Sequence, residues 1–147
     1  MDETKCNKIS RIKARELAMQ MLFAMDAQKD FSAEAKHRFF EHFPPQDQRG
    51  YIDAVHTAYI ENSRGIDAQI EESSDNWRLA RMGRVDLAVM RVAAAECWYM
   101  SEPTPQNIAI NEAVNVARKF AGDDSASFVN GVLGKIAKGR EQWEENK

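Results

Sequence analysis

The sequence contains few of the residues that cross-link a chain or interrupt its regular structure. Its 147 residues include two cysteines, seven glycines and four prolines. The two cysteines, Cys6 and Cys97, do not form a Cys-x-x-Cys pair, which argues against a disulfide framework and favours a reducing compartment. The low content of glycine and proline argues against a turn-rich all-β chain and favours helices.

Long apolar runs are also missing. No uncharged run reaches the roughly 18 residues of a membrane-spanning helix, and no apolar segment of signal-peptide length follows the N-terminal charges. The sequence therefore predicts a protein without a membrane segment, located in the cytoplasm.

The common catalytic and metal-binding motifs are missing as well. His37, His42 and His56 have neither the spacing of a helical ligand pair nor that of a zinc finger. The sequence has no Gly-x-Gly-x-x-Gly loop, no P-loop lysine and no Gly-x-Ser-x-Gly elbow. We therefore expect no enzyme activity, no metal ion and no cofactor.

Apolar residues recur at helical spacing along most of the chain, of which 44% is hydrophobic and 29% charged. This pattern predicts an all-α protein of about seven helices. The expected domain covers residues 1–138 and includes a basic arm at residues 1–15. Residues 139–147 are expected to form a charged tail that frays.

Several residues predict where these helices begin and end. Ser32 and Asp47 are expected to cap two helices, and Thr104 a third one with Pro105 at its first position. Gly122 is expected to end a helix, and so is Gly65. The expected helices cover residues 10–28, 32–43, 47–65, 66–70, 85–100, 105–121 and 123–136.

Two glycines lie inside the last expected helix. Gly131 and Gly134 each cost about 1 kcal/mol relative to alanine in a helix interior. We expect close packing of this backbone against a neighbouring helix to offset the cost.

Basic residues are concentrated at the start of the chain, although the net charge of the whole chain is −3. Local positive charge beside an acidic body favours an anionic partner such as nucleic acid. The alternative is that these side chains only keep the protein soluble. If the first helix reached back to Lys8, then Lys8, Arg11 and Arg15 would share one edge of it. The basic residues of this acid-free run are Lys5, Lys8, Arg11, Lys13 and Arg15.

Two other features also have alternative interpretations. Arg78, Arg81 and Arg84 recur at every third residue, which is typical of a solvated helix face. Phe128 precedes Val129 in the last expected helix, and its spacing favours the core. The edge of the buried stripe is the alternative position for its ring.

Three stretches of the sequence are long and specific. They are RIKARELA with LF behind it, MGRVDLAVMR, and INEAV leading through KF and DDS to FVNGVL. Together they resemble the NusB family of bacterial transcription antitermination factors, and the resemblance spans almost the whole chain.

The resemblance implies an all-α fold of two packed helical sub-bundles, one from the first three helices and one from the remainder. It also implies an adaptor without catalytic activity. Such an adaptor binds boxA RNA, most often in ribosomal RNA leaders, jointly with the small-subunit ribosomal protein NusE. The pair then joins RNA polymerase in an antitermination complex.

The resemblance further implies which residues bind RNA. The arginine-rich start of the family falls on Arg11, Lys13 and Arg15, and Lys8 lies just before them. The aromatic residue that the family places against an RNA base falls on Phe128. Stacking of this kind contributes roughly 1–3 kcal/mol per base.

The resemblance places the contact with the ribosomal protein at Asp86, with Arg81 and Met82 beside it. Two positions depart from the family pattern, because Ile12 and Ser127 stand where basic residues are frequent. Fewer basic residues mean fewer phosphate contacts, so we expect weaker or altered RNA affinity.

Two other functions fit the same resemblance. The fold also occurs as the RNA-binding domain of ribosomal RNA cytosine methyltransferases. A protein-interaction module that has lost RNA binding is the second alternative, and it fits the departures at Ile12 and Ser127. The apolar pattern leaves open whether the protein forms a homodimer.

Overall fold

The computed structural model describes residues 8–145, and this part of the chain is helical without strands. The all-α prediction is therefore confirmed, with six α-helices where about seven were expected. Two 3₁₀ turns, η1 and η2, and one π-helical turn, η3, join them. The bounds are α1 Arg11–Gln28, α2 Ala33–His42, η1 Gln46–Gln48, α3 Arg49–Ser73, η2 Leu79–Arg81, α4 Arg84–Ala94, η3 Ala95–Tyr99, α5 Gln106–Ala121 and α6 Asp123–Glu145.

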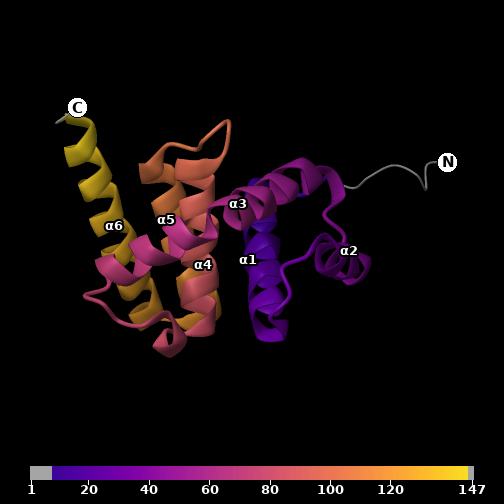
Figure 1. Ribbon diagram of the computed structural model, residues 1–147. Helices are drawn as coiled ribbons and strands as arrows, with labels where there is room; N and C mark the ends of the chain where they lie inside the picture. The colour runs from indigo at the N-terminus through magenta and orange to yellow at the C-terminus, as the bar shows by residue number, and fades with distance from the viewer. Residues whose placement is uncertain (1–7, 146–147) are drawn as a thin grey trace.

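The helices form two groups, as Figure 1 shows. Helices α4, α5 and α6 pack side by side at one end, and α1 and α2 lie at the other. Helix α3 crosses between the groups and packs against α1, α4 and α6. The predicted arrangement of two sub-bundles is confirmed. None of the described helices is both long and apolar enough to span a bilayer.

Serine side chains cap the first two helices. Ser10 Oγ accepts a hydrogen bond from the backbone N of Lys13 at 3.0 Å, and Ser32 Oγ accepts one from Ala35 N at 3.1 Å. The cap at Ser32 was predicted. Because Ser10 is extended, with φ −73° and ψ 160°, helix α1 begins at Arg11 and does not reach back to Lys8.

Helix α3 replaces two predicted helices, and Gly65 lies inside it instead of ending one. The backbone is kinked at Asn62, where φ is −128° and the side chain donates to the carbonyl of Ala58 at 2.8 Å. Ile66 and Ile70 are fully buried beyond the kink. Burial of these two side chains continues the helix past a glycine that local signals alone predict as its end.

Two other predicted caps are wrong. Asp47 Oδ1 accepts a hydrogen bond from the backbone N of Ile9, so it holds the segment before α1 instead of capping α3. Thr104 donates its hydroxyl to Glu96, and α5 has Pro105 at its N-cap without a side-chain cap. In both cases a residue outside the predicted helix takes the group that a local rule assigns to the helix cap.

Helix α5 ends at Gly122 as predicted, and the positive φ of 101° at this glycine explains why the chain turns there. Helix α6 instead continues to Glu145, through residues predicted to fray. The guanidinium of Arg140 lies over the rings of Trp98 and Tyr99, at 5.3 and 5.4 Å from their centroids. These contacts hold the end of α6 against η3.

Gly131 and Gly134 do not pack against a neighbouring helix. A Cβ atom built on either residue would meet no atom of the described chain within 4 Å. The predicted packing explanation is therefore wrong, and both positions face open space.

Because Gly131 and Gly134 face open space, we expect alanine to be tolerated at both positions. Gly131→Ala and Gly134→Ala are each expected to raise the free energy of unfolding by about 0.5–1 kcal/mol, because alanine restricts the unfolded chain and favours helix. Urea denaturation measures this change. Gly122→Ala, at a positive φ, is the control and should be destabilising. A loss of stability in Gly131→Ala would contradict the prediction.

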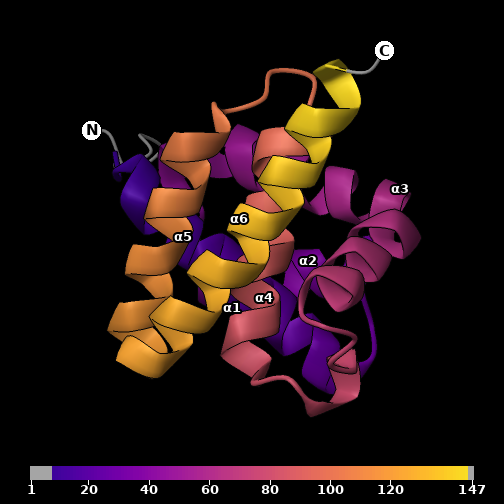
Figure 2. The same cartoon turned by 90° about the vertical axis from the view of Figure 1, so that its left-hand side faces the viewer.

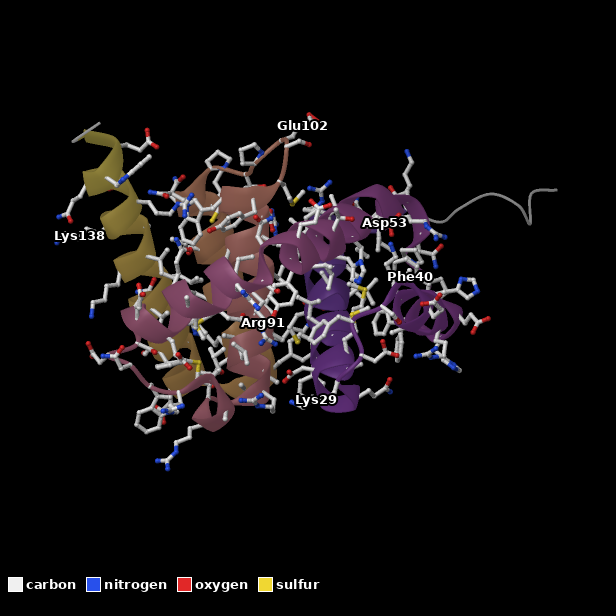
Figure 3. The ribbon with its side chains drawn as sticks, viewed as in Figure 1. Lys29, Phe40, Asp53, Arg91, Glu102 and Lys138 are labelled. Atoms are coloured by element: carbon white, nitrogen blue, oxygen red, sulfur yellow. The ribbon has the colours of Figure 1, made fainter. Side chains whose placement is uncertain are left out.

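An ionic cluster ties the two groups of helices together. Arg91 of α4 is 7% exposed, and its guanidinium lies 3.1 Å from Asp67 of α3 and 3.4 Å from Asp26 of α1. Figure 3 shows Arg91 in the interior between α4 and α1. Arg84 also pairs with Asp26, at 2.9 Å. The cluster fixes how α1, α3 and α4 lie relative to one another.

Candidate nucleic-acid interface

The predicted RNA-binding residues begin just before α1. Lys8 is exposed, and the next residue, Ile9, is held by η1. The backbone N of Ile9 donates to Asp47 Oδ1 at 2.8 Å, and its carbonyl accepts from Gln48 Nε2 at 3.3 Å. The path of the chain into α1 is therefore fixed on both sides of this residue.

Arg11 is exposed and preorganised. Its guanidinium carbon lies 4.2 Å from the centroid of the Tyr51 ring, and its Nε donates to Gln48 Oε1 at 2.8 Å. Its two terminal nitrogens have no partner among residues 8–145. They can donate two parallel hydrogen bonds to a phosphate.

Lys13 and Lys119 both lie close to the buried carboxylate of Glu16. Glu16 of α1 is 4% exposed, and its carboxylate lies 2.8 Å from Lys119 Nζ and 3.8 Å from Lys13 Nζ. Both lysines remain more than half exposed. The structure therefore adds Lys119 of α5 to the predicted cations, although 103 residues separate it from Glu16.

Arg15 lies apart from these exposed cations. Its side chain is 11% exposed, and its guanidinium donates to Glu96 at 2.6 and 3.0 Å and lies 3.6 Å from Glu112. Tyr51 and Thr104 also donate to Glu96, at 2.7 and 2.8 Å. Although burial raises the pKa of Glu96, these hydrogen bonds outweigh it and lower the pKa below its usual value. The geometry gives Arg15 an internal ion pair in place of an open phosphate site.

Phe128 occupies the edge of the buried stripe. It is partly buried and packs against the core, between the fully buried Ala126 and Val129. Phe120, at the end of α5, is 38% exposed, and Lys119 Nζ lies 5.5 Å from its ring centroid. Spacing favoured a core position for Phe128, whereas the structure leaves this residue partly exposed at the edge of the core.

Helix α5 connects the two parts of the predicted site. Figure 2 shows it running from beside the start of α1 to the corner where α6 begins. Lys119 contacts Glu16 of α1 and precedes Phe120 at this corner. The exposed positive charge of α1 is therefore extended by Lys119 towards the start of α6. We use the name α1–α5 basic surface for the exposed residues of these two helices taken together: Arg11 at the start of α1, and Lys13, Lys119 and Phe120.

The residues predicted to contact a protein partner separate into exposed and buried ones. Arg81 is exposed at the end of η2. Met82 is 4% exposed within the core, and Asp86 is 9% exposed with its carboxylate folded towards Gly83. Arg81 is therefore the accessible member, and next to it the structure exposes Trp77, at 52%.

The basic series before α4 is not a solvated helix face. Arg78 precedes the 3₁₀ turn η2 and Arg81 ends it, and both are exposed, whereas the Arg84 side chain turns back towards η2. Arg84 donates to the carbonyls of Leu79 and Met82 and pairs with Asp26. The sequence pattern therefore groups two exposed arginines with a third that is partly exposed and held by backbone carbonyls and Asp26.

Over residues 8–145 the structure contains no cluster of His, Cys, Asp and Glu side chains that could hold a metal ion. Cys97 is buried, and burial raises the pKa of its thiol to about 12, which keeps it protonated.

Comparison with known proteins decides the family. The model of the NusB family matches residues 12–138. The chain belongs to the NusB family. The transcription antitermination protein NusB of Alkaliphilus oremlandii is 41% identical over 128 residues, which cover 86% of this chain and 92% of that protein. The protein of the same name from Bdellovibrio bacteriovorus is 37% identical, over 88% of this chain and 96% of that protein.

Solved structures agree with the family. T. maritima NusB superposes with a TM-score of 0.79 at 25% identity, covering 94% of this chain and 99% of that one. A crystal structure of the antitermination factors NusB and NusE with dsRNA gives a TM-score of 0.77 at 24% identity, over 88% of this chain and 96% of that one. The latter likeness concerns the fold. The resemblance indicated by the sequence is thus confirmed.

The two predicted departures from the NusB pattern lie on the surface. Ile12 is 55% exposed between Arg11 and Lys13, and Ser127 is exposed next to Phe128. Neither side chain can neutralise a phosphate. Lys119 supplies a positive charge beside the same helix.

Proposed function

We propose that this protein is a transcription antitermination adaptor that binds boxA-type single-stranded RNA together with ribosomal protein NusE during ribosomal RNA transcription. One observation carries the proposal. Arg11 stands exposed and preorganised against Gln48 and Tyr51, and Lys13 and Lys119 stand exposed over Glu16, so three exposed cations lie on α1 and α5 of a NusB-family fold. The pair of proteins would then join RNA polymerase.

The named relatives support this proposal. They are transcription antitermination proteins, and the superposable complex contains NusB, NusE and RNA. That complex holds dsRNA, so a duplex of the same sequence belongs in the test. We propose a binding role without catalysis, because phosphate neutralisation and base stacking account for the recognition of single-stranded RNA.

The salt dependence of RNA binding gives the proposal a quantitative test. If Lys8, Arg11, Lys13 and Lys119 each neutralise one phosphate, log K should fall with log salt concentration with a slope of about −2 to −3, at roughly −0.7 per contact on single strands. Fluorescence anisotropy of a labelled boxA-type RNA, with and without NusE, measures both affinity and slope. A slope near zero would overturn the basic surface as the RNA site.

Phe128 is expected to stack on an RNA base. Phe128→Ala should then weaken RNA binding by about 1–3 kcal/mol, or roughly five- to 150-fold, with an unchanged salt slope because no phosphate contact is lost. Trp143→Ala is the matched control, since it removes a 62% exposed aromatic residue from the other end of α6. Equal effects of the two substitutions would contradict a specific role for Phe128.

We place the protein contact at the 3₁₀ turn before α4. Arg81 is its accessible member, with Arg78 and Trp77 exposed beside it. Tryptophan and arginine are the side chains most enriched at binding hot spots. Burial of Met82 and Asp86 suits them to support this turn more than to contact NusE directly.

The second candidate is a protein-interaction module with little RNA binding. The internal ion pair of Arg15 and the exposed Ile12 favour it, because both remove phosphate contacts from the start of α1. The two candidates differ in one measurable respect. Only the RNA-binding adaptor loses affinity for RNA when the exposed cations are removed.

A further inference from the structure

We propose that Asp47, Gln48 and Tyr51 form a clamp that positions Arg11 for an RNA phosphate. This inference rests on the proposed function, because it concerns how the RNA-binding start of α1 is held. It assigns a positioning role to residues of η1 and α3, which lie about 40 positions away from Arg11 in the sequence.

The clamp first holds the backbone. Asp47 accepts the N–H of Ile9, and Gln48 donates to the carbonyl of the same residue. Both polar groups of Ile9 are thereby satisfied two residues before Arg11. The chain can enter α1 along one path, which sets the direction in which the Arg11 side chain leaves the helix.

The clamp then holds the guanidinium. Gln48 Oε1 accepts the Nε–H of Arg11, and the guanidinium carbon lies over the Tyr51 ring, 4.2 Å from its centroid. These contacts leave the two terminal nitrogens without a partner among residues 8–145. An arginine fork in a fixed orientation loses less conformational freedom when it binds a phosphate than a free side chain does.

The clamp is anchored in the interior. Tyr51 is 6% exposed, and its hydroxyl donates to Glu96, the carboxylate that also holds Arg15 of α1. The Tyr51 ring and helix α1 are therefore fixed by the same buried acid. A shift of α1 relative to α3 would break the pairs at Glu96 and the stacking at Arg11 together.

Arg11 is also the cation of this surface for which positioning matters most. Glu16 partly neutralises Lys13 and Lys119. Arg11 has no carboxylate within ion-pair distance in the described part of the chain. No carboxylate of residues 8–145 pairs with it, and the neutral Gln48 and Tyr51 orient it without cancelling its charge.

Gln48→Ala tests the clamp, because Gln48 is only partly buried and its loss should not prevent folding. The dissociation constant of boxA-type RNA is expected to rise about three- to tenfold, as one side chain regains rotamer freedom. The salt slope should stay unchanged, since Arg11 still neutralises its phosphate in the complex. Gln28→Ala, at the other end of α1, is the matched control.

A double-mutant cycle separates positioning from a general structural effect. Arg11→Ala should make the salt slope less negative by about 0.7. In the Arg11→Ala background, Gln48→Ala should change RNA affinity less than about twofold, because there is no guanidinium left to orient. Tyr51→Leu should show the same dependence on Arg11, together with a loss of stability.

Two results would overturn the clamp. One is wild-type affinity in Gln48→Ala while Arg11→Ala weakens binding. The other is an equal loss in both backgrounds, which would indicate a structural effect unrelated to Arg11. If the wild-type protein binds no RNA, alone or with NusE, the proposed function fails first and the clamp with it.

Discussion

Arg15→Ala is expected to lower the free energy of unfolding by about 3–5 kcal/mol. The substitution leaves the carboxylate of Glu96, which is 1% exposed, without its ionic partner. Hydrogen bonds from Tyr51 and Thr104 remain, but they do not balance a buried charge. Urea denaturation monitored by circular dichroism measures the loss.

The effect on RNA should be small by comparison. At a temperature where the variant is folded, the salt slope of RNA binding should stay within about 0.3 of the wild-type value, less than half of the 0.7 expected per phosphate. Arg64→Ala removes an exposed arginine from α3 and should change stability by less than about 0.5 kcal/mol. A stable Arg15→Ala protein with a smaller salt slope would show instead that Arg15 contacts RNA.

Removing the exposed cations should have the largest effect on RNA binding. A variant with Arg11→Ala, Lys13→Ala and Lys119→Ala is expected to bind boxA-type RNA about a hundredfold more weakly near 0.1 M salt, with a slope less negative by about 2. Glu16→Gln is included, because Glu16 would otherwise be left buried without either lysine.

Glu16→Gln alone is the matched control for this variant. It removes the same buried carboxylate but retains all three cations, so it should bind RNA at least as tightly as the wild type. Unchanged RNA affinity in the full variant would reject the α1–α5 basic surface and favour the protein-interaction module. Retained binding to NusE would show that the variant is folded.

Local signals in the sequence were sufficient for much of the fold. The cap at Ser32, the stop at Gly122 and the apolar stripe of α1 depend on residues within a few positions of each other, and all three were predicted correctly. The prediction failed where a residue outside the helix takes the capping group. Asp47 binds Ile9, and Thr104 binds Glu96, so neither is a helix cap.

The candidate site shows the same difference between what local signals predict and what contacts between helices decide. The cluster of basic residues at the start of the chain could be identified from the sequence alone, and so could the chain's resemblance to the NusB family. Both indicated Arg11 and Lys13. Spacing along a helix placed Arg15 on the same edge as Arg11 and gave no means of separating the two. Its burial depends on Glu96 and Glu112, which come from η3 and α5.

The sequence by itself determined the helical class, the family and the presence of positive charge at the start of the chain, because periodicity, motifs and composition are properties of neighbouring residues. Only the tertiary structure decided which cations remain exposed, that Lys119 joins them, and that Gln48 and Tyr51 hold Arg11. These outcomes depend on packing between helices that are far apart in the chain. A charged side chain stays on the surface or enters an ion pair according to the partner that the fold brings to it.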